Sequence, residues 1–211
     1  MNLMEVPREA ENESGGNVKG VAIGIVTQND DPEGLCRVKV SYPWHDQPRE
    51  SYWARLASPM AGKGRGLVTI PEVGDEVLLA FERDDLRFPF VLGGLWNGKD
   101  KPPVDSEGGK NDKRLFKSRG GHQLLFDDGA RGVVELSLKD GKKLRLDDDG
   151  MRFDDGKGNR VSVDSGSGAM TIEATGKLSI KAASVAIQAS GGLDIKSGAV
   201  MSLNGSLIKL N

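Results

Sequence analysis

The sequence predicts an all-β chain in two parts, a small barrel or sandwich followed by a long repetitive segment. Short apolar runs alternate with turn residues throughout, and no segment keeps the 3.6-residue period over a helical length. Glycine supplies 29 of 211 residues, roughly twice its ~7% usual share. All aromatic residues lie at or before Phe153, so any core formed by residues 154–211 must be packed with smaller side chains.

Composition and charge exclude several classes of function. The net charge of −2 is too balanced for a chain that grips nucleic-acid phosphates or an anionic membrane surface. No run approaches the ~18 consecutive apolar residues of a membrane span. The only histidines, His45 and His122, restrict histidine-based catalysis and metal binding. We therefore expect no nucleic-acid partner and no cofactor.

The N-terminal residues and the single cysteine indicate where the protein is made. Residues 1–17 are polar, acidic and end in Ser-Gly-Gly, which predicts a flexible tail. They lack the basic start and apolar core of a signal peptide, and Cys36 alone excludes an internal disulfide. We therefore expect synthesis in the cytoplasm without a signal peptide.

Residues 18–98 predict a domain of short strands separated by Pro and Gly. Cys36, Val38 and Val40 alternate with basic residues, so we expect these three side chains to face the core. Residues 99–118 are rich in Pro and Gly and predict a linker. The expected strands cover residues 18–27, 35–42, 52–56, 66–70, 76–81 and 88–92.

Residues 119–211 carry the most informative pattern, a repeat of two apolar residues flanking one outward residue. The pair recurs about every eight residues, and Asp-Gly, Ser-Gly, Thr-Gly or Asn-Gly turns separate most units. Each unit is thus a strand of about five residues plus a turn. The ten pairs are Leu136/Leu138, Leu144/Leu146, Met151/Phe153, Val161/Val163, Met170/Ile172, Leu178/Ile180, Val185/Ile187, Leu193/Ile195, Met201/Leu203 and Ile208/Leu210.

The length of the repeat has a physical consequence. Eight residues span at most ~28 Å when fully extended, which is too short to circle a packed core alone. The chain must zigzag as a meander or share each circuit with other chains. A lone meander would expose its apolar face to water and leave open sheet edges. We therefore expect several copies around a common axis; the period alone does not select two, three or four.

Four motifs in the first part carry a family resemblance. They are ARLASP at 54–59, the glycine-rich turn 62–66, IPEVGDEVLLAFE at 70–82 and FPFVLGGLWN at 88–97. This succession resembles the OB-fold domain of phage baseplate spike proteins of the baseplate protein V type. The same domain occurs in the VgrG spikes of type VI secretion and in the spikes of extracellular contractile injection systems. The repeat continues the resemblance to the end of the chain.

The resemblance implies a structural protein without enzymatic activity. It implies a homotrimer whose OB-fold barrels seat on a hub and whose C-terminal chains intertwine into a β-helix or triangular β-prism needle. Sheath contraction would drive this needle through a target cell envelope, from a virion tail baseplate or an injection particle. The ten pairs would then form the trimer core, and the tip would consist of Ile208, Lys209, Leu210 and Asn211.

Three departures from the family pattern refine these expectations. No lysozyme insert separates the barrel from the repeat, so muralytic activity is not expected. No hub domain precedes Val18, so we expect a separate hub protein at the OB end. Residues 206–211 lack the His-x-His pair that binds a metal in some phage spikes. We therefore expect a separate PAAR-like tip protein at the C-terminal end.

Two motifs that suggest ligand binding are better explained as turns. Residues 61–66 lack the Lys-Ser/Thr ending and the following helix of a phosphate loop. Asp147 begins a stretch that resembles a calcium loop, but the twelfth position is Gly158 rather than the required Glu. We expect a barrel loop at the first and a solvated turn at the second.

Two other functions remain as alternatives. An OB-fold domain could bind single-stranded nucleic acid or sugar, although near-neutral charge argues against nucleic acid. A polysaccharide-degrading tail spike would use paired carboxylates, but the acids of the repeat sit beside glycines in turns and no aromatic residue lies beyond Phe153. Binding at low salt and loss of polysaccharide viscosity would identify these alternatives.

Overall fold

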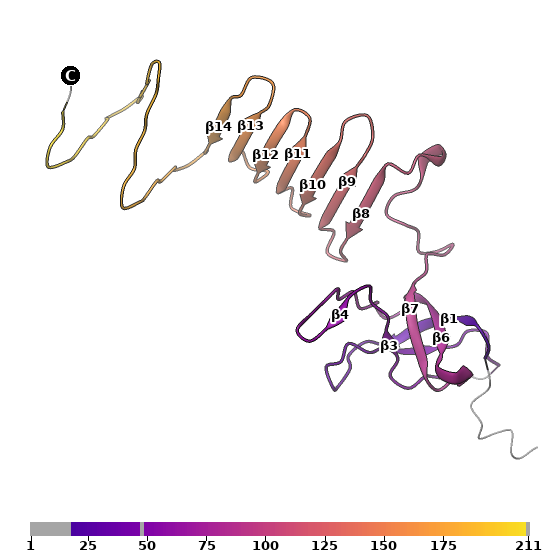
Figure 1. Ribbon diagram of the computed structural model, residues 1–211. Coiled ribbons are helices and arrows are strands. Elements are labelled where there is room, and N and C mark those ends of the chain that lie inside the picture. The colour runs from indigo at the N-terminus through magenta and orange to yellow at the C-terminus, as the bar shows by residue number, and fades with distance from the viewer. Residues whose placement is uncertain (1–17, 47–48, 210–211) are drawn as a thin grey trace, which may run out of the picture. The chain divides into compact units, whose positions relative to one another are not determined.

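The computed structural model describes residues 18–46 and 49–209, which form two compact units divided between Lys110 and Asn111 (Figure 1). Both units are built from strands, and the described part of the first unit also has the short 3-10 helices η2 (Glu82–Asp84) and η3 (Glu107–Gly109). Within the described residues, no helix has the length and apolar character needed to cross a membrane. The expected tail at 1–17 lies outside the described residues.

The first unit is a five-stranded curled sheet that closes into a barrel. The sheet has the order β2-β1-β6-β7-β3, and its strands are β1 (Val21–Gln28), β2 (Lys39–Ser41), β3 (Arg55–Leu56), β6 (Glu76–Phe81) and β7 (Pro89–Gly94). Val38 and Ala54 exchange backbone hydrogen bonds of 3.0 and 2.7 Å, which join the two outer strands. The predicted small barrel is thereby confirmed.

The barrel encloses a core of ten buried apolar side chains. Tyr42 donates a 2.6 Å hydrogen bond from its hydroxyl to the carbonyl of Leu86, and burial raises the pKa of Tyr42 to about 12. Buried polar groups are stable in a core when they are paired in this way. The ten residues are Val26, Val38, Val40, Tyr42, Ala54, Val77, Leu79, Phe81, Leu86 and Val91.

Two details of the barrel differ from the sequence prediction. Cys36 is exposed, with a left-handed backbone at φ 57°, because the preceding loop turns back on itself rather than extending as a strand. Residues 67–70 form no strand; the strands there are β4 (Ala61–Gly62) and β5 (Arg65–Gly66), a small hairpin. The expected barrel loop at 61–66 is this hairpin.

The second unit contains a single seven-stranded antiparallel sheet in chain order, from β8 to β14 (Figure 1). Every strand pairs with the next one along the chain, as the eight-residue repeat predicts for a meander. The strands are β8 (Lys113–Lys117), β9 (Gln123–Asp127), β10 (Val133–Ser137), β11 (Lys143–Asp147), β12 (Gly150–Asp154), β13 (Arg160–Asp164) and β14 (Met170–Glu173).

The sheet begins earlier than the sequence pattern indicates. Strand β8 lies inside the expected linker 99–118 and pairs along its whole length with β9. Leu115 faces Leu125 and Phe116 faces Leu124 across this pair. The Pro- and Gly-rich linker is therefore shorter at its C-terminal end, because cross-strand apolar pairs stabilise residues that carry no strand signal of their own.

Candidate functional site

One face of the second sheet is lined almost entirely by apolar side chains. The pleat sends alternate residues of each strand to this side, so each strand from β9 to β14 contributes two and β8 contributes Phe116. Arg114 is the polar residue on this side. We call this surface the apolar face; it comprises Phe116, Leu124, Phe126, Val134, Leu136, Leu144, Leu146, Met151, Phe153, Val161, Val163, Met170 and Ile172.

The strand register aligns these residues into two columns. Leu144 lies opposite Leu136 on one side and Phe153 on the other, and Met151 lies between Leu146 and Val163. The same matching holds across all six strand pairs, with no register shift between β8 and β14. A shift of one residue would transfer a strand's apolar set to the opposite face, so the unbroken register keeps the surface continuous.

The apolar face is open to solvent in the single chain. Its exposed fractions run from 36% at Val161 to 66% at Met170, and Val163 alone is only partly exposed. Proteins that stay monomeric rarely expose a contiguous apolar surface of this extent. The geometry thus indicates that another surface must cover this face.

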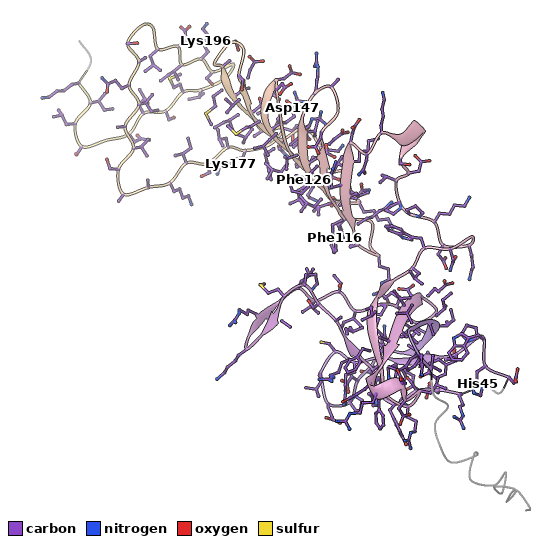
Figure 2. All side chains as sticks on the ribbon, turned by 45° about the vertical axis from the view of Figure 1, so that its right-hand side comes forward. His45, Phe116, Phe126, Asp147, Lys177 and Lys196 are labelled. Atoms are coloured by element: carbon purple, nitrogen blue, oxygen red, sulfur yellow. The ribbon has the colours of Figure 1, made fainter. Side chains whose placement is uncertain are left out.

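The opposite face, which we call the charged face, carries ion pairs both within and between strands. Arg145 lies 2.6 Å from Asp147 and 3.4 Å from Glu135, and Arg160 lies 2.9 Å from Asp154. Asp147 is labelled in Figure 2, as are Phe116 and Phe126 of the apolar face. From β11 to β13 the two faces therefore differ in chemistry, with charged and polar side chains on one and hydrocarbon on the other, whereas Leu115, Leu125 and Val133 lie on the charged face nearer the start of the sheet.

Two carboxyl groups of the charged face have lowered pKa values. The Arg145 guanidinium lowers the pKa of Asp147, and backbone N–H donation from Gly156 with help from Arg160 lowers that of Asp154. A groove of about 510 Å³ runs over these strands and is lined by these charged groups. Their partners are already present within the sheet, so the groove is a solvated, ion-paired surface.

The turn that resembles a calcium loop is a tight hairpin between β11 and β12. Asp147 accepts a 3.1 Å hydrogen bond from the N–H of Asp149, and Asp149 pairs with Arg131 at 3.1 Å. Within residues 18–46 and 49–209, no group of three side chains is placed to hold a metal ion. The carboxylates of Asp147 and Asp149 are thus bound by groups of the protein itself.

The chain beyond β14 keeps the apolar pairs but forms no strand between residues 174 and 209. All residues of this stretch are exposed. In Figure 1 it is a zigzag trace without arrows, and Figure 2 labels Lys177 and Lys196 along it. Its pairs are therefore available to a partner, since none is covered by the chain itself.

The predicted core residues of the first half of the repeat lie on or beside the sheet. Leu138 lies one residue beyond β10 and donates its N–H to the Lys142 carbonyl. Nine others lie on the apolar face: Leu136, Leu144, Leu146, Met151, Phe153, Val161, Val163, Met170 and Ile172.

The predicted core residues of the second half lie in the exposed segment, and this differs from the burial that a core implies. Ile195 and Leu203 are each 63% exposed. The reason is that no strand of the same chain pairs with this segment, so a core there requires other copies. Leu210 and Asn211 lie outside the described residues. The exposed members are Leu178, Ile180, Val185, Ile187, Leu193, Ile195, Met201, Leu203 and Ile208, together with Lys209 of the expected tip.

Sequence reasoning missed four residues of the apolar face. Phe116, Leu124, Phe126 and Val134 continue both columns toward the start of the sheet. The signal for Leu124 and Phe126 was the same two-residue spacing after a Gly-Gly turn. Phe116 had no such signal, because β8 contributes only one apolar side chain to this face.

The barrel also presents an apolar surface, on the outside of β1, β6 and β7. Val21 and Ile23 point away from the core, because Ala22, Gly24 and Val26 face inward. Their neighbours across the strands are Ala80 and Leu78. We call this surface the outer barrel face; it comprises Val21, Ile23, Leu78, Ala80, Phe90 and Leu92.

The barrel matches a known family. Residues 22–96, which include most of β1 and all of the strands from β2 to β7, match the type VI secretion system/phage-baseplate injector OB domain. This match agrees with the resemblance carried by the four motifs and confirms it.

Known spike proteins resemble part of the chain. The type VI secretion system spike proteins VgrG1c and VgrG4b of Pseudomonas aeruginosa are each 32% identical, over 44% and 59% of this chain. Actin cross-linking toxin VgrG1 of Vibrio cholerae is 28% identical over 57% of this chain. The matched stretches cover 14%, 16% and 12% of those proteins, so the chain spans only a small part of their length.

The barrel and the matches agree on the first unit. Residues 22–96 are similar to the injector OB domain of type VI secretion systems and phage baseplates, and the chain resembles spike proteins of the VgrG type.

Proposed function

We propose that the chain is the structural central spike of a contractile injection machine. The observation that carries this proposal is the apolar face, a continuous exposed surface over seven strands on a chain with an injector OB domain. Copies that set this face toward a common axis bury it and leave the charged face in water. The product is a stiff shaft suited to transmitting force.

The number of copies in this proposal is three. This number is what the resemblance to baseplate spike proteins implies, since the period of the repeat alone does not select it. The side chains of the apolar face are large near β8 and β9, and only aliphatic beyond Phe153. The interior of the assembly would therefore become narrower toward the C-terminal end. Such a shape fits a needle whose homotrimeric core is formed by the ten predicted pairs.

The outer barrel face supports a seat on a separate hub protein. After Glu76, strand β6 reads Val-Leu-Leu-Ala-Phe, a continuous apolar run, and such runs are typical of strands covered on both sides. The barrel core covers only one side, so Leu78 and its neighbours need a further partner. In this proposal the hub protein supplies that cover.

The residues at the C-terminal end would form the tip of the shaft. Ile208 is 48% exposed and Lys209 is also exposed, so a PAAR-like tip protein would find an apolar and a cationic contact. In this proposal the C-terminal end of the assembly contacts the target cell envelope first. The spike acts within a phage baseplate or a secretion machine.

The carboxyl groups favour a mechanical role over catalysis. A general acid at neutral pH needs a raised pKa. Within the described residues, every carboxyl with a resolved shift has its pKa lowered. On the charged face these include Asp147, Asp154 and Asp164, whose lowered pKa values are the opposite of what a proton-donating acid needs.

Light scattering of the purified chain tests the proposal. We expect a particle of about three times the 22.6 kDa chain mass. A monomer at micromolar concentration would contradict the proposal, because the apolar face would then be stable in water. Loss of viscosity of a capsular polysaccharide would instead favour the tail-spike enzyme, and a salt-sensitive shift with single-stranded DNA would favour an OB-fold ligand-binding protein.

A further inference from the structure

Two Asn-Gly steps occur in the sequence, and the fold holds them differently. They are Asn97-Gly98, shortly after β7, and Asn204-Gly205, in the exposed stretch that follows β14. At such a step the backbone nitrogen of the glycine can attack the side-chain amide carbon of the asparagine, because glycine has no Cβ that shields its nitrogen. This reaction is one reason why asparagine is a thermolabile residue.

Three hydrogen bonds fix the side chain of Asn97. Its carbonyl oxygen accepts the N–H groups of Lys99 (2.9 Å) and Asp100 (2.7 Å). Its amide nitrogen donates to the Glu76 carboxylate at 2.9 Å. Attack by the Gly98 nitrogen requires the side chain to rotate and the amide nitrogen to leave Glu76, so these bonds must break first.

The side chain of Asn204 has no such restraint. Both Asn204 and Gly205 are exposed, and no group of the described residues forms a hydrogen bond with the Asn204 amide. No strand forms between residues 174 and 209, so no ladder bond fixes the Gly205 nitrogen. The amide carbon of Asn204 and this nitrogen can therefore reach the contact that the reaction requires.

We propose that Asn204 is a site of spontaneous deamidation, whereas the fold protects Asn97. The Gly205 nitrogen gives its proton to hydroxide and forms a bond with the Asn204 amide carbon. The bond from this carbon to the amide nitrogen then breaks, and ammonia leaves with a proton taken from water, which restores the hydroxide. The cyclic succinimide takes up one water molecule and opens on either side, to aspartate or isoaspartate, without an oxidant or an enzyme.

The modification changes both charge and spacing near the C-terminal end. Lys209 is the only charged side chain of residues 201–211, and the new carboxylate cancels its charge. In isoaspartate the backbone also runs through the side-chain methylene, which lengthens the chain between the last two apolar pairs. In the proposed shaft, aged copies therefore offer a tip protein a different surface; this consequence alone rests on the proposed function.

Peptide mapping of the full chain tests the proposal. The native protein is incubated at mildly alkaline pH, samples are digested at acidic pH, and mass spectrometry follows the mass gain that replacement of an amide by a carboxylate gives. We expect Asn204 to react faster than Asn97 by roughly tenfold or more, which corresponds to about 1.4 kcal/mol of activation free energy. In urea the two sites should react at similar rates, because the Asn-Gly step is the same.

Two glycine variants are matched controls. Neither Gly205 nor Gly98 has a left-handed backbone. An added Cβ would lie 3.6 Å or more from non-neighbouring atoms at Gly205 and would meet none within 4 Å at Gly98, so both variants should fold. Gly205→Ala should slow the reaction of Asn204 roughly tenfold, whereas Gly98→Ala should leave it unchanged.

Three results would each overturn the assignment. They are equal rates at the two asparagines of the native protein, no reaction at Asn204, and an undiminished rate at Asn204 in the Gly205→Ala variant. The oligomeric mass is measured separately on the same samples. A particle of the expected mass with any of these results refutes the modification site and leaves the spike proposal intact.

Discussion

At the scale of single residues, side-chain contacts decide details that alternation of apolar residues cannot show. The carboxylate of Asp31 accepts hydrogen bonds from the N–H groups of Glu33, Leu35 and Arg37. The Arg37 guanidinium lies 2.7 Å away, and only 2% of the Asp31 side chain is exposed. These bonds shape the loop, and Cys36 consequently turns outward.

The Asp31–Arg37 pair should make the barrel sensitive to acid. Arg37 holds the pKa of Asp31 well below its usual range near 4. A depressed folded-state pKa gives stability that is present above the unfolded pKa and is lost as pH falls below it. We expect the melting temperature of Asp31→Asn to fall at pH 7 and to change less between pH 7 and pH 3 than that of the wild type. Exposed Asp30→Asn is the control; equal acid sensitivity in all three proteins would contradict the assignment.

Gly150 should be intolerant of any side chain. Its φ is +142°, and an added Cβ would overlap the backbone oxygen of Val163. We expect Gly150→Ala to destabilise the second unit by roughly 2–4 kcal/mol, because backbone on both sides must shift. Gly132→Ala, which meets no atom within 4 Å, should leave chemical denaturation unchanged. Equal stability of the two variants would show that the β12–β13 contact is not tight.

At the scale of elements, the period of the repeat predicted the meander and most of the apolar face. Leu144, Met151 and their counterparts were found because each strand repeats the same two-residue spacing. Strand β8 was missed because Phe116 stands alone and its partner lies on β9. The end of self-pairing at Glu173 was also missed, since the repeat runs on unchanged and the bonds between Thr175 and Asn159 are not visible in it.

The repeat segment offers a matched test of inward and outward positions. In the proposed shaft Ile187 faces the axis and Ala186 faces solvent. We expect Ile187→Asp to block assembly, because an unpaired charge in a dry core costs several kcal/mol in each copy. Ala186→Asp should assemble normally. Analytical ultracentrifugation distinguishes the two, and intact oligomers of Ile187→Asp would contradict the packing.

At the scale of the whole molecule, the two apolar surfaces predict separable partners. Ile23 and Leu92 lie on the outer barrel face and are 41% and 45% exposed. We expect Ile23→Asp with Leu92→Asp to weaken binding of the hub protein tenfold or more, about 1.4 kcal/mol or above, without changing the oligomeric mass. Val73→Asp, exposed in the turn before β6, serves as the control. The affinity for the hub protein is measured by surface plasmon resonance. An unchanged affinity of the double variant would show that the hub protein binds another surface.

The connections of the second sheet have a consequence for the order of events after synthesis. Because β8 to β14 join only sequence neighbours, the ladder requires no long loop closure and can form quickly on each nascent chain. The hydrophobic surface of this sheet then stays exposed to solvent until other copies bind to it. During this period non-specific aggregation competes with assembly. The yield of correctly assembled particles should therefore depend more on the expression level of the chain and on the growth temperature than on the stability of the assembled shaft.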